Sequence, residues 1–243
     1  MSGHSKWHNI QAKKGKADAQ KAKIFTKIGR EIAVAVKAGG PDPNSNAKLY
    51  DAIQKAKQNN MPNDRIQNGI KKASGELSSI NYEQLVYEGY GCAGVAVIVE
   101  TLTDNKNRTG GDVRYVFDKS GGQMGTTGCV SFMFDRRGII VIDKEENPGL
   151  DFDTLMDYCL EGGADDITEE DDCFEVLTTI PAFSSACKFL EAQNVKIASS
   201  EMGWIPQNTV EIPEDKIETF EKMLDRFDEL DDVQNVFHNA ANV

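Results

Sequence analysis

The chain has 243 residues, of which 40% are hydrophobic and 27% charged, a composition typical of a globular protein with one large domain or a few small ones. The first residues match neither an apolar signal peptide nor a Ser- and Arg-rich transit sequence, and the longest apolar run, residues 95–99, is too short to span a membrane. We therefore expect a cytoplasmic protein.

The formal net charge of −12 conceals two segments of opposite sign. Residues 1–75 contain 15 Lys and Arg against 5 Asp and Glu, whereas residues 76–243 contain 12 against 34. A basic segment carried by an acidic remainder is typical of proteins that bind nucleic acid.

Three amphipathic helices with short connections are predicted in the basic segment, which indicates a small helical bundle. The first spans residues 18–38, with Asp18 as its N-cap and two glycines at its end. Its apolar residues recur every three or four positions: Phe25, Ile28, Ile32 and Val36. The second helix begins near residues 44–45 and ends at 61–62. The third is capped by Asn63 and ends at Gly75.

Opposite the apolar stripe of the first helix lie four cations, which we call the lysine-bearing face: Lys23, Lys27, Arg30 and Lys37. Such a face is often only the solvated side of a helix. Here Asp18 and Glu31 are the only acids in residues 1–41, so acidic partners do not alternate with the cations. This pattern favours contact with phosphate groups.

An arm at residues 2–17 precedes the first helix and contributes Lys6, Lys13, Lys14 and Lys16. Trp7 suits either a hydrophobic notch on the bundle or stacking on an exposed base. His4 and His8 stand four residues apart, but with His238 as the only other histidine and no cysteine nearby we expect no metal site.

Strands alternate with helices beyond residue 75, in the manner of two split βαβ modules. The expected strands are residues 82–90, 95–101, 129–134, 139–142, 174–178, from about 195, 209–212 and 233–237. The expected helices are residues 103–119, 152–160, 181–193 and 214–227. The fold class is therefore α+β with three domains. These are a basic helical domain with its arm (1–78), a discontinuous α+β domain (79–134 plus 206–243) and an acidic α+β domain (135–205) inserted in the second.

No motif indicates catalysis. The glycine-rich stretch at 121–128 lacks the lysine of a P-loop and precedes a strand, so it is interpreted as a helix stop and turn. Five cysteines without a C-x-x-C pair predict buried, reduced thiols. We expect no enzyme activity, cofactor, metal or small-molecule substrate.

A second basic stretch lies at the start of the predicted helix 103–119, where Lys106 and Arg108 are followed by Arg114. Helix N-termini already attract anions, so added cations there point to phosphate or another anion. An ordinary surface loop fits these residues equally well.

Six short segments in this order closely resemble the YebC/PmpR family, which includes mitochondrial translational activators of cytochrome oxidase. They are GHSKW at 3–7, FTK at 25–27, NMP at 60–62, YEGYG at 87–91, DNKNRT at 104–109 and GGQMG at 121–125. Cys92-Ala93 departs from the Pro-Gly that the family usually has in this turn. The resemblance implies a helical bundle followed by two α+β domains, the third inserted in the second, and a non-enzymatic regulator. Some members carry the label of probable transcriptional regulators that bind DNA, and others resemble ribosome-associated translation factors.

Lysine contacts phosphate charge and conveys little sequence information, and no helix-turn-helix pattern is visible, so we favour RNA, ribosomal RNA foremost, and a translation factor. DNA-bound transcriptional control is the alternative. A third possibility, an adaptor that binds only proteins, would leave the basic segment unexplained. The acidic remainder is expected to face away from nucleic acid. The predicted nucleic-acid contacts are His4, Lys6, Trp7, Lys13, Lys14, Lys16, Lys23, Lys27, Arg30, Lys106, Arg108 and Arg114.

Overall fold

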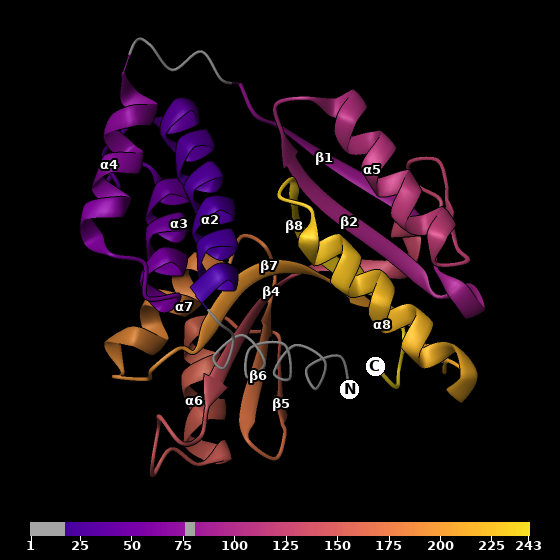
Figure 1. The fold of residues 1–243 in the computed structure, drawn as a ribbon. Coiled ribbons are helices and arrows are strands. Elements are labelled where there is room, and N and C mark those ends of the chain that lie inside the picture. The colour runs from indigo at the N-terminus through magenta and orange to yellow at the C-terminus, as the bar shows by residue number, and fades with distance from the viewer. Residues whose placement is uncertain (1–17, 76–80) are drawn as a thin grey trace. The chain divides into compact units, whose positions relative to one another are not determined.

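The computed structural model describes residues 18–75 and 81–243, with side chains from residue 21 onward (Figure 1). The chain divides into two compact units: residues 133–207 form one, and the described residues before 133 together with 208–243 form the other. The described residues contain N-terminal helices and two sheets of four antiparallel strands, which confirms the predicted α+β class. The boundaries of the three predicted domains stay a prediction.

The N-terminal helices are α2 (Asp18–Gly39), α3 (Ala47–Gln58) and α4 (Asn63–Ser74). They share an apolar core in which the predicted stripe of α2 meets the buried faces of the other two helices. Its fully buried members include Ile28, Ile32, Leu49, Ala56 and Ile66. The three predicted helices are confirmed, with shifted starts. Asn46 caps α3, and Pro62 rather than Asn63 occupies the N-cap of α4.

Asn46 explains why α3 starts where it does. Its Oδ1 accepts the Leu49 N–H at 3.2 Å, while its Nδ2 donates to the carbonyls of Ala35 at 2.7 Å and Gly40 at 2.8 Å. One buried amide therefore satisfies both the end of α2 and the start of α3. A Cβ on Gly39 would lie 2.8 Å from this amide, so glycine is required there by close approach.

The first sheet has the strand order β3-β1-β2-β8. Its strands are β1 (Glu83–Tyr90), β2 (Ala96–Thr103), β3 (Gln123–Met124) and β8 (Val233–His238). Helices α5 (Lys106–Lys119) and α8 (Glu214–Glu229) pack on one face, where Val97 and Val99 of β2 meet Phe117, Phe220 and Phe227. This sheet fixes the start of α5, which lies directly after β2.

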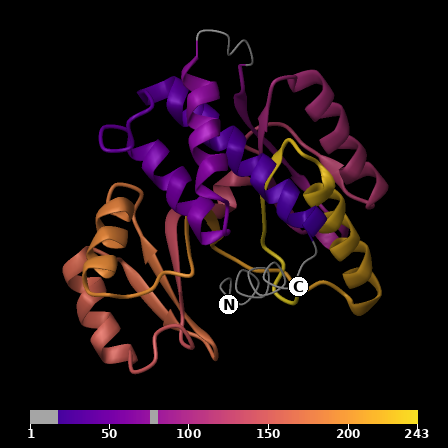
Figure 2. The ribbon, with the colours of Figure 1, turned by 60° about the vertical axis from the view of Figure 1, so that its left-hand side comes forward.

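The second sheet has the order β5-β6-β4-β7. It contains β4 (Phe134–Asp143), β5 (Asp166–Glu169), β6 (Cys173–Thr178) and β7 (Ser199–Pro206), with helices α6 (Phe152–Gly162) and α7 (Phe183–Ala192). Both helices lie on the same face of the sheet, as Figures 1 and 2 show, and bury Ile140, Ile142 and Phe174. The connectivity β-α-β-β-α-β is that of a split βαβ module, as predicted.

Several predicted strands differ from the structure. Residues 131–133 form a 3₁₀ turn instead of a strand, and the strand predicted at 139–142 begins earlier, at Phe134. The strand expected from 195 starts at Ser199, and the one expected over 209–212 is reduced to a single parallel bridge between Val210 and Ala240. The short strands β3 and β5 were not predicted.

A buried carboxylate accounts for the missing strand at 129–134. Glu88 is 3% exposed, and its two oxygens accept the backbone N–H groups of Gly128, Val130 and Ser131 at 2.7–2.9 Å. These donors would otherwise be free to join a strand ladder, so the loop curls around Glu88. Burial tends to raise the pKa of Glu88, but these hydrogen bonds outweigh it and lower the pKa below its ordinary value.

Candidate nucleic-acid interface

The lysine-bearing face of α2 has acidic partners that the local sequence does not show. Lys27 pairs with Asp228 at 3.0 Å and Arg30 pairs with Asp232 at 2.6 Å, and their side chains are only 12% and 16% exposed. Lys37 donates to Oδ1 of Asn81 at 3.0 Å. The expectation of a face without acidic partners was therefore wrong for Lys27 and Arg30, because the acids come from a segment about two hundred residues away.

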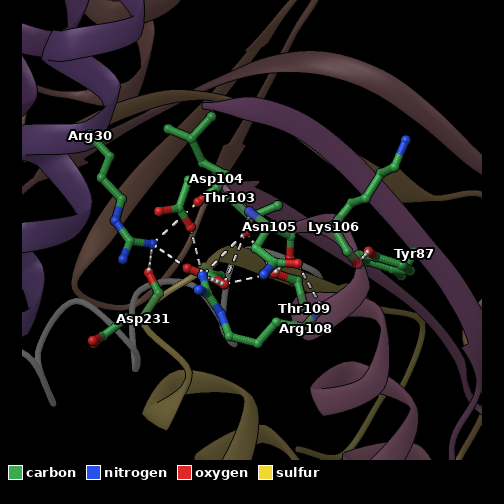
Figure 3. Close-up of polar contacts among 11 residues, drawn as sticks. Arg30, Tyr87, Thr103, Asp104, Asn105, Lys106, Arg108, Thr109 and Asp231 are labelled. Atoms are coloured by element: carbon green, nitrogen blue, oxygen red, sulfur yellow. Dashed lines mark hydrogen bonds and ion pairs between the residues drawn. The ribbon is translucent and has the colours of Figure 1, made fainter. Parts of the chain in front are cut away.

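Arg30 forms hydrogen bonds to backbone carbonyls in addition to its ion pair with Asp232. Its Nη1 also donates to the carbonyls of Asp231 at 2.7 Å and Leu102 at 3.2 Å, as Figure 3 shows around Arg30 and Asp231. A guanidinium with this set of acceptors is held firmly in place. Lys23, about two turns before Arg30 on the same helix, is half-buried and forms no ion pair with any residue that the structure describes.

The carboxylate of Asp232 collects donors from α5 as well. Arg108 Nη2 donates to its Oδ2 at 2.8 Å and to Asp104 Oδ1 at 2.8 Å, and the hydroxyls of Thr109 and Thr103 donate to Oδ2 at 2.7 and 3.1 Å. Two predicted phosphate contacts, Arg30 and Arg108, are thus brought together, but on an internal carboxylate (Figure 3).

The charge state of this cluster follows from its contacts. Burial tends to raise the pKa of Asp232, but hydrogen bonds from Arg108, Thr109 and Arg30 outweigh burial and lower the pKa to about 2. The hydrogen bond and charge of Asp232 in turn raise the pKa of Arg108. Asp232 is therefore ionised and Arg108 protonated at neutral pH. In the structure, both guanidinium groups hold this internal carboxylate.

Lys106 and Arg114 are oriented differently from Arg108. Both are exposed, and in Figure 3 the Lys106 side chain extends away from the cluster around Arg108. They line a groove of about 520 Å³ between α5 and the edge of β1. The other lining residues are Leu85, Val86, Tyr87, Asn107, Gly110, Gly111, Met124 and Thr127. No Asp or Glu is among these described lining residues.

Further cations, not among the contacts predicted from sequence, lie on α3 and α4. Exposed basic side chains occur along both helices: Lys48, Lys57, Arg65, Lys71 and Lys72. The Arg65 guanidinium lies 5.1 Å from the centre of the Phe25 ring. The signal that could have found them is the charge of residues 1–75, which the cations of α2 and the arm only partly explain.

Within residues 18–75 and 81–243, no cluster of His, Cys, Asp and Glu has the geometry of a metal site. Burial raises the pKa of Cys159 and of Cys173 to about 11, and Cys92 is also buried and reduced, as predicted. Cys129 and Cys187 are half-buried. In the same described ranges, no helix is both long and apolar enough to cross a membrane.

Comparison with known proteins identifies the family. The family model of the TACO1/YebC N-terminal domain matches residues 5–76, and that of the TACO1/YebC second and third domain matches residues 82–240. The chain belongs to the TACO1/YebC family. The predicted resemblance is therefore confirmed over nearly the whole sequence.

Similar members of the TACO1/YebC family occur in clostridia and related bacteria. A protein of Clostridium botulinum (strain Okra / Type B1) is 57% identical over 99% of this chain and 97% of its own length, and carries the name "Probable transcriptional regulatory protein". A protein of Acetivibrio thermocellus with the same name is 55% identical over 98% of each chain. The crystal structure of a conserved hypothetical protein from Aquifex aeolicus is 40% identical, with a TM-score of 0.84 over 93% of this chain and 92% of that one.

Half of the predicted nucleic-acid contacts of this TACO1/YebC chain lie in the arm, outside the described residues: His4, Lys6, Trp7, Lys13, Lys14 and Lys16. Among the described ones, Lys27, Arg30 and Arg108 are engaged in internal ion pairs. Lys106 and Arg114 share one groove, and Lys23 lies apart from it on α2.

Proposed function

We propose that this chain is a non-enzymatic regulator of gene expression that acts in the cytoplasm by binding nucleic acid through its basic helical part and arm. The observation that carries the proposal is the set of exposed cations on α3 and α4 in a chain of net charge −12. Residues 21–75 hold 11 Lys and Arg against 4 Asp and Glu. Such a surplus on a small helical surface attracts phosphate groups and releases their counterions.

RNA is the favoured ligand, and ribosomal RNA and the ribosome the favoured partner. Of the five exposed cations on α3 and α4, only Arg65 is an arginine. Lysine binds phosphate as a point charge and does not read base edges in the bidentate way that arginine does. Structured RNA is recognised mainly through shape and backbone, so a lysine surface with the arm and Trp7 suits a translation factor.

DNA is the second candidate, and the names of the relatives favour it. The Clostridium and Acetivibrio proteins are called probable transcriptional regulatory proteins. In that case the same cations would neutralise the phosphates of a promoter duplex, and sequence would be read by residues or by DNA shape beyond them.

The proposal is tested by the salt dependence of binding. The double variant Lys71→Ala/Lys72→Ala is compared with Lys188→Ala/Lys222→Ala, which removes the same charge from exposed positions of α7 and α8. Fluorescence anisotropy is measured with a ribosomal RNA hairpin and with a promoter duplex. The log–log slope of affinity against salt should fall by about 0.7–0.9 for each lysine that contacts a phosphate.

The control pair should leave the slope of the wild-type protein unchanged. A slope that also stays unchanged in the α4 pair would contradict the proposed interface. Crosslinking in cells, followed by sequencing of both RNA and DNA, distinguishes between RNA and DNA as the ligand. We expect ribosomal RNA to be enriched, and enrichment of promoter DNA without it would select transcriptional control.

A further inference from the structure

The groove between α5 and the free edge of β1 has features that the bundle surface lacks. We propose that this groove binds an unpaired stretch of nucleic acid, with phosphates on Lys106 and Arg114 and bases against the β1 wall. The proposal rests on the proposed function and adds to it a second contact site that is selective for single strands.

The two cations are spaced for a chain of phosphates. Lys106 and Arg114 lie eight residues apart on α5. Their side chains therefore differ by about 80° in direction around the helix axis and by about 12 Å along it. Because this separation exceeds the width of one phosphate group, each cation contacts a different phosphate. Neither forms an ion pair with a described residue, whereas Arg108, between them in sequence, turns toward Asp232.

Two adjacent glycines lie between these cations on the helix surface. A Cβ on Gly110 would lie in ordinary van der Waals contact with the Tyr87 hydroxyl, at 3.4 Å. A Cβ on Gly111 would meet no atom within 4 Å, so no neighbour in the described structure requires it. Glycine weakens a helix interior. A ligand backbone that lies directly on the helix explains why this position lacks a side chain.

The opposite wall is apolar and carries one aromatic ring. Leu85, Val86 and Met124 line it together with Tyr87, whose hydroxyl donates to the carbonyl of Lys106 at 3.3 Å. Burial, and then the charge of Asp232, raise the pKa of Tyr87, so this donor keeps its proton. A tyrosine fixed in this way offers its ring to a base without further ordering.

The strand edge beside this wall is also available. In the described structure β3 pairs with β1 only at Gly89 and Tyr90, so residues 83–87 have no strand partner on that side. Their backbone polar groups can hydrogen-bond to base edges of a bound strand.

The combination of separated cations and an apolar wall favours a single strand over a duplex. A duplex hides its bases within the stack and presents phosphates alone, whereas an unpaired strand offers both phosphates and flat apolar bases. An extended acidic peptide added to the β1 edge is the competing occupant. We favour the nucleic acid because a peptide strand would use the β1 edge but has no need of the bare helix surface at Gly111.

The test blocks the groove without changing charge. Gly111→Leu is compared with Ser185→Leu, which adds the same side chain at an exposed position of α7. Binding of the full chain to a fluorescent oligouridylate and to a hairpin duplex is measured by anisotropy. Gly111→Leu should weaken oligouridylate binding about tenfold, the effect of losing one stacked base, and leave duplex binding unchanged. Ser185→Leu should alter neither.

A second variant tests the same groove through its charge, in case Gly111→Leu does not fold. Lys106→Gln/Arg114→Gln should lower the salt slope for the oligouridylate by about 1.4 and leave that for the duplex unchanged. Wild-type affinity of both variants for oligouridylate would overturn the proposal while the proposed function stands. A peptide of alternating Glu and Val serves as the competing ligand. If this peptide binds the wild-type protein, and Gly111→Leu abolishes binding of the peptide but not of oligouridylate, the groove is a peptide site. A wild-type protein that binds no nucleic acid would refute both proposals.

Discussion

Asp232 shows how one carboxylate can determine the role of several cations. Its side chain is 10% exposed and accepts hydrogen bonds from Arg30 of α2 and from Arg108 and Thr109 of α5. Removing the charge of such a residue leaves its partners short of an acceptor in a place with little water. We therefore expect the cluster around Asp232 to contribute to the stability of the fold.

Asp232→Asn should destabilise the fold by about 2 kcal/mol at neutral pH, the free energy that corresponds to lowering the pKa from 3.8 to about 2. Because the folded pKa lies below the unfolded one, this stability is present above about pH 4 and is lost as the pH falls toward 2. Urea denaturation of the variant and the wild-type protein between pH 7 and acid measures it.

Asp231→Asn is the matched control. Asp231 is exposed and contributes its backbone carbonyl to Arg30, which the substitution keeps. The control should unfold at the wild-type urea concentration. A constant difference between Asp232→Asn and wild type down to acidic pH would show that the ionised carboxylate is not the source of the stability.

The candidate site could be predicted from sequence only where charge is local. The composition of residues 1–75 located the basic part, and the segment at 104–109 located the start of α5. The acids that engage Lys27 and Arg30 lie at 228 and 232, and no periodicity connects them to α2. Three of the predicted phosphate contacts, Lys27, Arg30 and Arg108, form internal ion pairs, which only the tertiary structure can show.

At the scale of elements, α5 contains an unusual pair of helix-interior glycines. Gly111→Ala should stabilise the protein by about 0.5–1 kcal/mol, because alanine is the better helix former and its Cβ meets open space. Gly110→Ala should gain a similar amount, because its Cβ would lie in ordinary contact with the Tyr87 hydroxyl, at 3.4 Å. Thermal unfolding of both variants provides the measurement, and a loss of stability in either variant would contradict the expectation.

Helices were predicted better than strands, for a physical reason. The apolar periodicity of α2, α5 and α8 belongs to the helix itself and survives as the buried faces of each. Strand formation depends on a partner. Residues 135–137 are polar, yet they extend β4 because β7 pairs with them as far as Pro206, and the Arg136 guanidinium lies 4.9 Å from the Trp204 ring centre.

At the scale of the whole molecule, the unit at 133–207 has the features of an inserted domain. Phe134 pairs with Pro206, and the N–H of Gln207 donates to the carbonyl of Met133 at 2.9 Å, so the chain enters and leaves at one place. Its core of Ile140, Phe174 and Leu190 is its own. The bounds predicted from sequence for the inserted domain, 135–205, remain a prediction.

A fragment of residues 133–207 should therefore fold alone, with modest stability because small domains bury little surface. Far-UV circular dichroism and urea unfolding measure this, and a cooperative transition is the expected result. A fragment without helical signal or without a transition would contradict an independent inserted domain. The matched deletion, with residues 133 and 207 joined by a short linker, should keep the first sheet intact.

The Arg30–Asp232 pair joins residues 202 positions apart in sequence, which has a consequence for synthesis on the ribosome. At about 5–20 residues per second, Asp232 leaves the ribosome roughly 10–40 s after Arg30. During that interval Lys27 and Arg30 lack Asp228 and Asp232, the acids that pair with them in the folded protein. Both cations of the nascent helix therefore wait for these partners until the end of α8 and the turn before β8 have been synthesised.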